Sequence, residues 1–244
     1  MNSTPRDTIY SSKKDELSGF SFNKQVASVF PDMISRSVPG YDTTIEMLPT
    51  LAELYIQNDS RVYDLGCSLG ASTLPIMNCA TKRNCKVIGI DNSESMLEQC
   101  QKIVNSHTCS ECVELICTDL QHVDYQNASM VIMNYTMQFV PIDVRLQLLT
   151  VIQESLLPDG VLVLSEKITF PEPQINQDMI DLHEEFKRSN GYSELEISQK
   201  RAALENVLIP EHLNQHRTRL FSAGFSRVEI ICQVLNFCTI LAIK

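Results

Sequence analysis

The chain has 244 residues, enough for one large domain or two small ones, and its apolar fraction of 43% is ordinary for a globular protein with a full core. Its 20 basic and 30 acidic residues give a net charge of −10, which argues against a protein that binds duplex DNA or RNA through a basic surface. A small anionic substrate held by one or two local arginines remains compatible with this charge.

The first part of the chain divides into an arm and a helical segment. Residues 1–22 are polar and predict a flexible N-terminal arm, and residues 23–244 are expected to form a single domain. Residues 23–57 have helical spacing of their apolar positions, with breaks expected at Pro31 and at residues 37–40.

From residue 61 onward, strands and helices alternate. Strands are predicted at residues 61–66, 86–91, 113–119, 129–135 and 161–167, and helices at residues 71–82, 93–106 and 142–157. Because the strand interiors are continuous apolar runs, the alternation predicts right-handed crossovers and a doubly wound, mostly parallel sheet covered on both faces. We expect an α/β fold with a seven-stranded sheet.

The end of the chain departs from this alternation. Residues 171–209 are polar and helical and follow the fifth strand, so they predict an insertion over the strand ends that is a candidate lid. Residues 225–244 hold two β-rich runs with a short break, which predicts an antiparallel hairpin at the edge of the sheet.

The cysteines and histidines give no metal-binding pattern. Nine cysteines, an odd number scattered along the chain, indicate free thiols in a reducing compartment. Cys109 and Cys112 have CxxC spacing, but no second ligand pair follows, so we expect no metal. His212 and His216 are expected on a solvated helix face. With no signal peptide and no apolar run long enough to span a bilayer, we expect a cytoplasmic protein without membrane contact.

The first strand and its loop read VYDLGCSLGAS (62–72), which raises the question of the ligand. The loop lacks the third-glycine spacing of the dinucleotide fingerprint. Asp64 beside a pyrophosphate would add repulsion of about 1 kcal/mol. S-adenosylmethionine has an ammonium and a sulfonium and no phosphate, so the Asp64 carboxylate would attract it. This contrast favours S-adenosylmethionine.

Polar residues end the next three strands. Asp91 is suited to ribose hydroxyls, and Asp119 to the amino group of adenine. The backbone N–H of Leu120 would reach the neighbouring ring nitrogen, and Asn134 would lie beneath the sulfonium. Each residue alone is compatible with a cap or a turn, but together with Asp64 they favour one shared pocket.

Methyl transfer has little support in the sequence. The fourth strand is followed by NYTM (134–137) rather than an Asn-Pro-Pro-aromatic run, and no cysteine stands at that strand end as a nucleophile. The sequence resembles the carboxy-S-adenosyl-L-methionine synthase family, which has the class I methyltransferase (Rossmann-like) fold. The similar segments are FPDMISRSVPGY (30–41), VYDLGCSLGAST (62–73), IDNS (90–93), NASMVIMN (127–134), LVLSEK (162–167) and FKRSNGYSELEISQKRAALENVL (186–208).

The resemblance implies conversion of S-adenosylmethionine and prephenate to carboxy-S-adenosylmethionine, phenylpyruvate and water. It also implies a homodimer, and a product that serves a separate enzyme modifying the wobble uridine of tRNA, without direct tRNA binding by this chain. Either S-adenosylmethionine or the carboxylated product would occupy the site. Matching positions imply ligand contacts from Tyr41, Gly66, Cys67, Ser68, Asp91, Asn92, Asp119, Leu120, Asn134 and Arg201.

Arg201 is expected to bind the new carboxylate, from its own or a neighbouring subunit, whereas Lys200 is expected on a solvated helix face. Two other functions stay open on the sequence: a methyltransferase acting on a small acid or RNA, and a non-enzymatic S-adenosylmethionine-binding regulator. The insertion discriminates them, since only a synthase needs a cation facing the methyl group and a second subsite for an anion.

Overall fold

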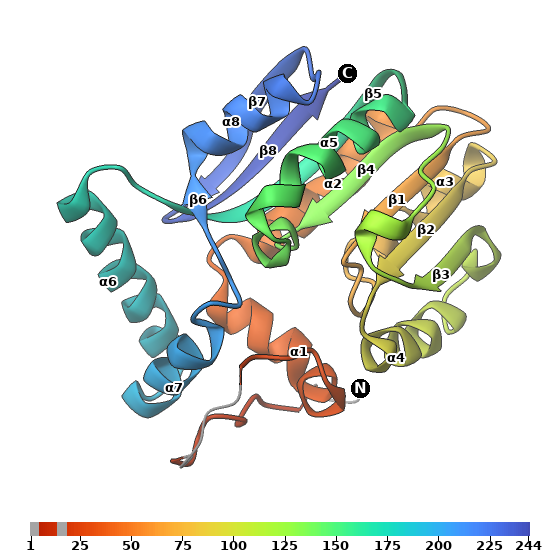
Figure 1. Ribbon diagram of the computed structural model, residues 1–244. Coiled ribbons are helices and arrows are strands. Elements are labelled where there is room, and N and C mark those ends of the chain that lie inside the picture. The colour runs from red at the N-terminus through yellow and green to blue at the C-terminus, as the bar shows by residue number, and fades with distance from the viewer. Residues whose placement is uncertain (1–4, 14–18) are drawn as a thin grey trace.

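The computed structural model describes residues 5–13 and 19–244; residues 1–4 and 14–18 of the expected N-terminal arm lie outside the described residues. Within the described part, seven strands form one sheet in the order β3-β2-β1-β4-β5-β8-β7 (Figure 1). They are β1 (Arg61–Leu65), β2 (Lys86–Asp91), β3 (Val113–Cys117), β4 (Ala128–Asn134), β5 (Leu156–Thr169), β7 (Arg227–Val234) and β8 (Phe237–Ile243). The first five strands pair in parallel and β8 is antiparallel to both neighbours, which confirms the predicted sheet and hairpin.

Helices cover both faces of this sheet. They are α1 (Lys24–Ser37), α2 (Tyr41–Tyr55), α3 (Thr73–Lys82), α4 (Glu94–Asn105), α5 (Ile142–Ser155), α6 (Pro173–Ser189), α7 (Glu194–Leu204) and α8 (Leu213–Ser222). Short 3-10 helices are η1 (Ser110–Cys112), η2 (Leu120–His122) and η3 (Met137–Phe139). Apolar side chains of α2, α3 and α4 pack on one face, and those of α5 and α8 pack on the other, so successive strand residues are buried on opposite sides. No helix in the described part of the chain has the length and apolar character needed to cross a bilayer.

The boundaries of one helix and one strand correct two of the predictions. The break expected at residues 37–40 is confirmed, since α1 ends at Ser37 and Gly40 has a φ of 79°. The break at Pro31 is wrong, because α1 continues through it. Asn23 caps the helix, and buried Val26 and Met33 anchor it in an apolar cluster that compensates for the missing proline N–H. The fifth strand also starts earlier than predicted, at Leu156.

Helix α1 and the helix pair α6–α7 lie beyond the C-terminal ends of the parallel strands (Figure 1). Helices α6 and α7 form the predicted insertion. Residues 5–13 of the expected arm contact this group. The Asp7 side chain is 2% exposed, its carboxylate accepts a hydrogen bond of 2.7 Å from the Tyr192 hydroxyl, and its backbone N–H donates to Asp32 at 2.7 Å. The arm therefore connects α1 to the turn between α6 and α7.

The chain returns from the insertion through a short strand, β6 (Glu211–His212), which pairs in parallel with the end of β5. Glu211 forms ion pairs with Arg145 of α5 and with Arg219 of α8, the latter at 2.5 Å. Arg145 is fully buried and also donates to backbone carbonyls of the η3 region and of Ile209. This network fixes the return of the insertion to the sheet.

His216 of α8 overturns the expectation of a solvated helix face. Its side chain is 1% exposed, and neither ring nitrogen has a hydrogen-bond partner within the described residues. Burial lowers the pKa of His216 to about 4, so the ring is neutral at physiological pH. The i,i+4 spacing with His212 gave no signal for this burial, because the helix is buried against β7 and α5 by long-range contacts.

Replacing Glu211 by alanine should lower the free energy of unfolding by about 3–5 kcal/mol, because it leaves the buried Arg145 guanidinium without a counter-charge. Urea unfolding followed by circular dichroism measures this change. The matched control is Arg227→Ala, which removes an ion pair of 3.9 Å between exposed side chains and should cost less than about 1 kcal/mol. Equal small losses in both variants would contradict the role of the network.

Candidate active site

A cavity of about 1010 Å³ opens at the C-terminal edge of the sheet, where the strand order reverses between β1 and β4. Such reversals are where ligands bind in open α/β sheets. The predicted site residues that line the cavity are Tyr41, Gly66, Cys67, Ser68, Asp91, Asn92, Asp119, Leu120, Asn134 and Arg201. The structure therefore brings together every predicted site residue except Asp64.

The glycine loop after β1 uses its own backbone donors within the protein. The N–H groups of Gly66 and Cys67 both donate to the carbonyl of Ile90, at 2.8 and 3.0 Å. The N–H of Ser68 donates to the Asp91 carboxylate at 2.9 Å. A pyrophosphate would need these donors, since helix-start loops bind phosphates through free backbone N–H groups. The loop is thus built for a ligand without a phosphate.

Asp64 lies under this loop and does not line the cavity. Strand alternation turns its side chain toward α3, where the Thr73 hydroxyl donates to it at 2.7 Å. The carboxyl is 1% exposed, and burial raises its pKa to about 7, while the Thr73 hydrogen bond opposes the rise and the nearby Asp91 adds to it. Asp64 therefore supports the start of α3, and its predicted direct contact with a ligand is not supported by its position.

The carboxylates at the ends of β2 and β3 are held in fixed positions. Asp91 accepts hydrogen bonds of 2.9 Å from the backbone N–H groups of Ser68 and Ser93. Burial raises the pKa of Asp91, while these N–H groups act against the rise by stabilising the charged form. The Asn92 amide donates to Asp119 at 2.9 Å. Two carboxylates and an amide thus form an acidic rim at one end of the cavity.

The end of β4 is tied to its neighbours on both sides. The Asn134 amide donates to Ser72 at 2.9 Å and accepts from Ser165 of β5 at 2.6 Å. Gly66 lies opposite, with a φ of 75°, and a Cβ there would stand 2.3 Å from the Thr136 hydroxyl. Only glycine allows the first loop to approach β4 this closely.

Aromatic side chains cover the acidic end from the α1 side. Phe22 makes edge-to-face contacts with Phe20, Phe30 and Phe139, with ring centroids 5.1, 6.0 and 5.3 Å apart. All four rings line the cavity. They supply an apolar wall facing the acidic rim, which suits a ligand with a flat apolar ring and polar edges such as adenosine.

Arg201 and Lys200, adjacent on α7, occupy different environments. Arg201 lines the cavity with a side chain that is 68% exposed, and its guanidinium pairs with Glu184 at 2.9 Å. Lys200 is 9% exposed and its ammonium donates to the Ser37 hydroxyl at 2.9 Å, so the expectation of a solvated face for Lys200 is wrong. Burial lowers the pKa of Lys200 to about 8.

Two further lysines line the same end of the cavity and were not predicted from the sequence. Lys167 comes from the end of β5 and Lys187 from α6. Burial is the main cause that lowers the pKa of both, to about 7 for Lys187. Lys167 is the last residue of the predicted fifth strand (161–167), two residues beyond Ser165, which is in register with Asn134 of β4. Applying the strand-end rule to all five strands would have identified it.

The loop, the acidic rim and the cavity over the strand reversal define a class I S-adenosylmethionine-dependent methyltransferase fold. Residues 62–160 match the family described as methyltransferase domain. Solved structures similar to this chain support the fold alone. A putative O-methyltransferase from Nostoc punctiforme has a TM-score of 0.62 at 17% identity, and the alignment covers 91% of this chain and 59% of that one. The pyocyanin biosynthetic protein PhzM has a TM-score of 0.60 at 18% identity, with 91% and 58% covered.

Sequence relatives identify the family within this class. The chain is 48% identical to the carboxy-S-adenosyl-L-methionine synthase of Actinobacillus pleuropneumoniae serotype 5b, over 98% of this chain and 99% of that protein. Synthases of the same name from Psychromonas ingrahamii and Shewanella halifaxensis are 49% and 47% identical, covering 98% and 100% of both chains. The chain belongs to the carboxy-S-adenosyl-L-methionine synthase family.

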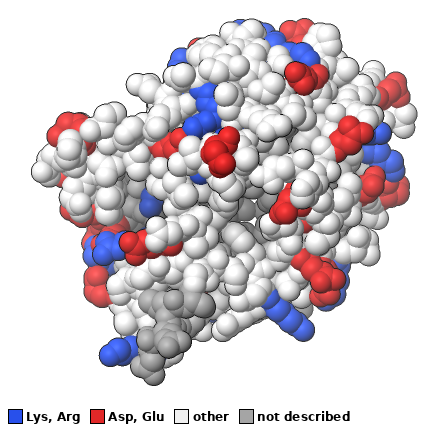
Figure 2. Space-filling view, in the orientation of Figure 1, with Lys and Arg blue, Asp and Glu red and all other residues white. Residues whose placement is uncertain are grey.

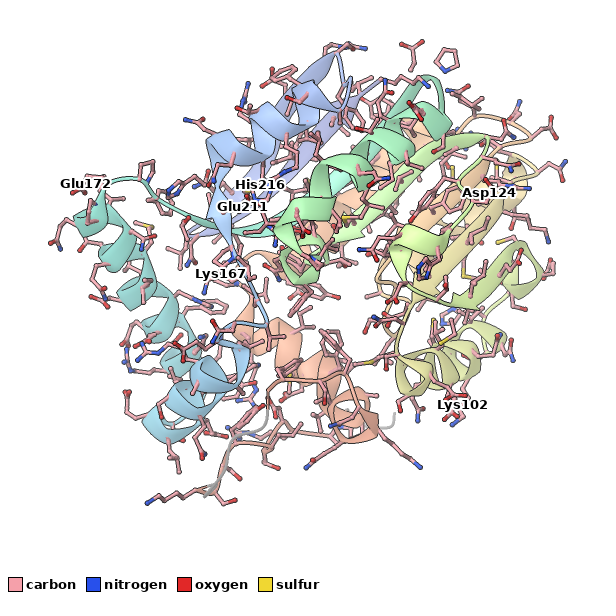
Figure 3. The ribbon with its side chains drawn as sticks, viewed as in Figure 1. Lys102, Asp124, Lys167, Glu172, Glu211 and His216 are labelled. Carbon is pink, nitrogen blue, oxygen red and sulfur yellow. The ribbon has the colours of Figure 1, made fainter. Side chains whose placement is uncertain are left out.

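Replacing Asp91 by alanine should weaken S-adenosylmethionine binding by about 2–3 kcal/mol, because the observed hydrogen bond from the glycine loop and the predicted one from the ribose would be lost together. Isothermal titration calorimetry measures the affinity. Asp124→Ala is the control, since Asp124, labelled in Figure 3, is exposed and is not part of the cavity lining. Unchanged affinity in Asp91→Ala would remove this carboxylate from the ligand site.

Proposed function

We propose that this protein converts S-adenosylmethionine and prephenate into carboxy-S-adenosylmethionine, phenylpyruvate and water. The observation that carries the proposal, within this family, is a single cavity with an acidic rim at one end and lysines at the other. The acidic rim suits a cationic sulfonium substrate, and the lysine end suits a carboxylic acid. A methyltransferase for a neutral acceptor has no need for the second end.

The chemistry balances between these two substrates. A sulfonium acidifies its methyl C–H bonds, and loss of a proton gives an ylide. Prephenate becomes aromatic by losing carbon dioxide and hydroxide, which leaves phenylpyruvate; the hydroxide and the methyl proton form water. The ylide carbon then bonds to the carbon dioxide. The protein contributes by holding both substrates close together and by excluding water from the ylide with the apolar wall around Phe22.

The new carboxylate lies on the former methyl carbon, and we propose Arg201 as its partner. The guanidinium has five N–H donors in a planar fork, and in the described part of the chain only one nitrogen of Arg201 bonds to a protein group, Glu184. The remaining donors are available for a carboxylate. S-adenosylmethionine lacks this carboxylate, so the contact with Arg201 would form only with the carboxylated product.

Arg201→Ala should keep S-adenosylmethionine affinity within about tenfold and lose most of the carboxylated product, because the new carboxylate loses the cation that would pair with it. Arg201→Lys should recover only part of the activity, since an ammonium cannot form the bidentate fork. The matched control is Arg188→Ala, which also removes a partner of Glu184, at 3.4 Å, but from outside the cavity lining. Wild-type synthesis by Arg201→Ala would overturn this role.

The proposed function also concerns the enzyme that uses the product and the cellular location of this protein. We propose that the product serves a separate enzyme that modifies the wobble uridine of tRNA, and that this chain does not bind tRNA itself. In support, the chain has a net charge of −10, and the lysines and arginines visible on the described surface are scattered among acidic side chains (Figure 2). A cytoplasmic location agrees with the nine cysteines, all described and all free thiols.

A homodimer is the proposed assembly. Ile175 and Leu182, seven residues apart and therefore on one face of α6, are 47% and 48% exposed, and this apolar face supports contact with a second subunit there. If Arg201 acts in the neighbouring subunit, dilution below the dimer dissociation constant should abolish synthesis.

Native mass spectrometry after incubation with S-adenosylmethionine and prephenate tests the function. The expected bound ligand is heavier than S-adenosylmethionine by the mass of one carbon dioxide, with phenylpyruvate in solution. S-adenosylhomocysteine as the only product would instead establish a methyltransferase, and unchanged S-adenosylmethionine would contradict both enzymatic functions.

A further inference from the structure

The end of β5 aims a lysine into the cavity. Ser165 donates to Asn134 at the cavity's edge, and because side chains alternate along a strand, Lys167 points to the same side as Ser165. Glu166 points to the opposite side, where it is buried and accepts the N–H of Met137 at 2.9 Å. Figure 3 shows Lys167 between the sheet and the α6–α7 pair.

The ammonium groups of Lys167 and Lys187 have no ion pair or hydrogen bond within the described residues, whereas other charged groups nearby are paired. Glu184, the acid that lines this end, forms ion pairs with Arg201 at 2.9 Å and with Arg188 at 3.4 Å. Lys200 is held by Ser37. The charges of Lys167 and Lys187 repel each other, and Glu184 offsets this repulsion only in part because it is already ion-paired with two arginines. An anionic ligand would remove the remaining penalty.

A row of aromatic rings leads from the cofactor end to these lysines. The centroids of Tyr41 and Tyr135 are 6.1 Å apart, those of Tyr135 and Phe237 are 6.0 Å apart, and those of Phe237 and His183 are 4.9 Å apart. All four rings line the cavity. His183 contributes no charge: burial lowers its pKa to about 2, and its Nε2 donates to the Ser37 carbonyl at 2.8 Å.

We propose that Lys167 and Lys187 bind the carboxylate groups of the co-substrate, and that Tyr135, Phe237 and His183 form the apolar floor beneath its ring. The inference rests on the proposed function and adds the subsite and the residues that select the co-substrate. The site is specific for an acid with a six-membered ring, because a ringless diacid leaves the aromatic floor unfilled and a neutral ring leaves both ammonium groups unpaired.

The first test compares Lys167→Met and Lys187→Met with Lys102→Met, an exposed lysine of α4 on the far side of the molecule (Figure 3). Each cavity variant should raise the KM for prephenate about 10- to 100-fold, the loss expected for one charge-assisted hydrogen bond, and leave S-adenosylmethionine affinity within about threefold. Lys102→Met should change neither quantity. Unchanged KM in both cavity variants would overturn the proposal.

Folding of the variants separates binding from a structural role. Burial, followed by the positive charge of Lys167, lowers the pKa of Lys187, so the charged form of Lys187 destabilises the fold at neutral pH. The urea midpoint of Lys187→Met should therefore equal or exceed that of the wild type. A clear loss of stability, with KM unchanged, would assign Lys187 to the structure instead.

The pH profile gives a second readout. With the Lys187 pKa near 7, the ammonium is lost as pH rises above 7, and affinity for the acid should fall with it. The charged and titratable groups that face Lys187 are Lys167, His183, Glu184, Lys200 and Arg201. Lys187→Arg stays charged, so the alkaline fall of kcat/KM for prephenate should move to higher pH. An identical profile in wild type and Lys187→Arg would contradict the role of this ammonium.

Direct binding distinguishes this inference from the proposed function. Calorimetry with phenylpyruvate and with malonate needs no turnover: Lys187→Met should weaken both, whereas Phe237→Leu should weaken phenylpyruvate alone. If the wild type forms no carboxylated product yet shows this binding pattern, the subsite stands and the synthase function fails. If product forms but neither variant changes binding or KM, the synthase function stands and the subsite is wrong.

Discussion

In the proposed reaction one cavity must hold a sulfonium and a carboxylic acid, two groups of opposite charge, close enough to react. The fold meets this constraint by separating its charges along the sheet edge. Asp91 and Asp119 stand at the ends of β2 and β3, while Lys167 stands at the end of β5, on the other side of the strand reversal. Uncharged Asn134 lies between them, so neither end neutralises the other and both remain available to ligands.

The end of the cavity that contains Lys167 and Lys187 is formed by elements from the C-terminal half of the chain. Lys187 is supplied by the insertion, and its helix α6 contacts α1, while the return strand β6 is held by the pairing of Glu211 with Arg145 and Arg219. Arg145 also bonds the backbone around η3, next to the cavity. The same buried ion-pair network thus connects the insertion to the wall of the site, and stability and co-substrate binding share one set of contacts.

Sequence reasoning predicted the sheet, the hairpin and the acidic rim, because strand ends are read from local apolar runs and parallel strands bring their ends to one edge. It failed where distant packing decides. Pro31 stays inside α1, His216 is buried, and Lys200 rather than Arg201 is the enclosed cation of α7, since each depends on which segment lies against it. For Asp64 the local pattern was sufficient and was not used. Alternation of side chains along β1 directs its carboxylate toward α3 and away from the cavity, and a direct ligand contact was predicted only from its negative charge.

The insertion leaves β5 at Thr169 and returns at Glu211, and these two positions are neighbours because β6 pairs with the end of β5. A segment whose ends meet can lengthen, shorten or change its sequence at little entropic cost to the rest of the fold. The insertion can therefore vary in sequence while the strand ends at the acidic side of the cavity keep their own residues, and the two parts meet only in the cavity that both line. Exchanging the insertion between related proteins at this one point is therefore a direct engineering route to changing the second substrate of the proposed reaction.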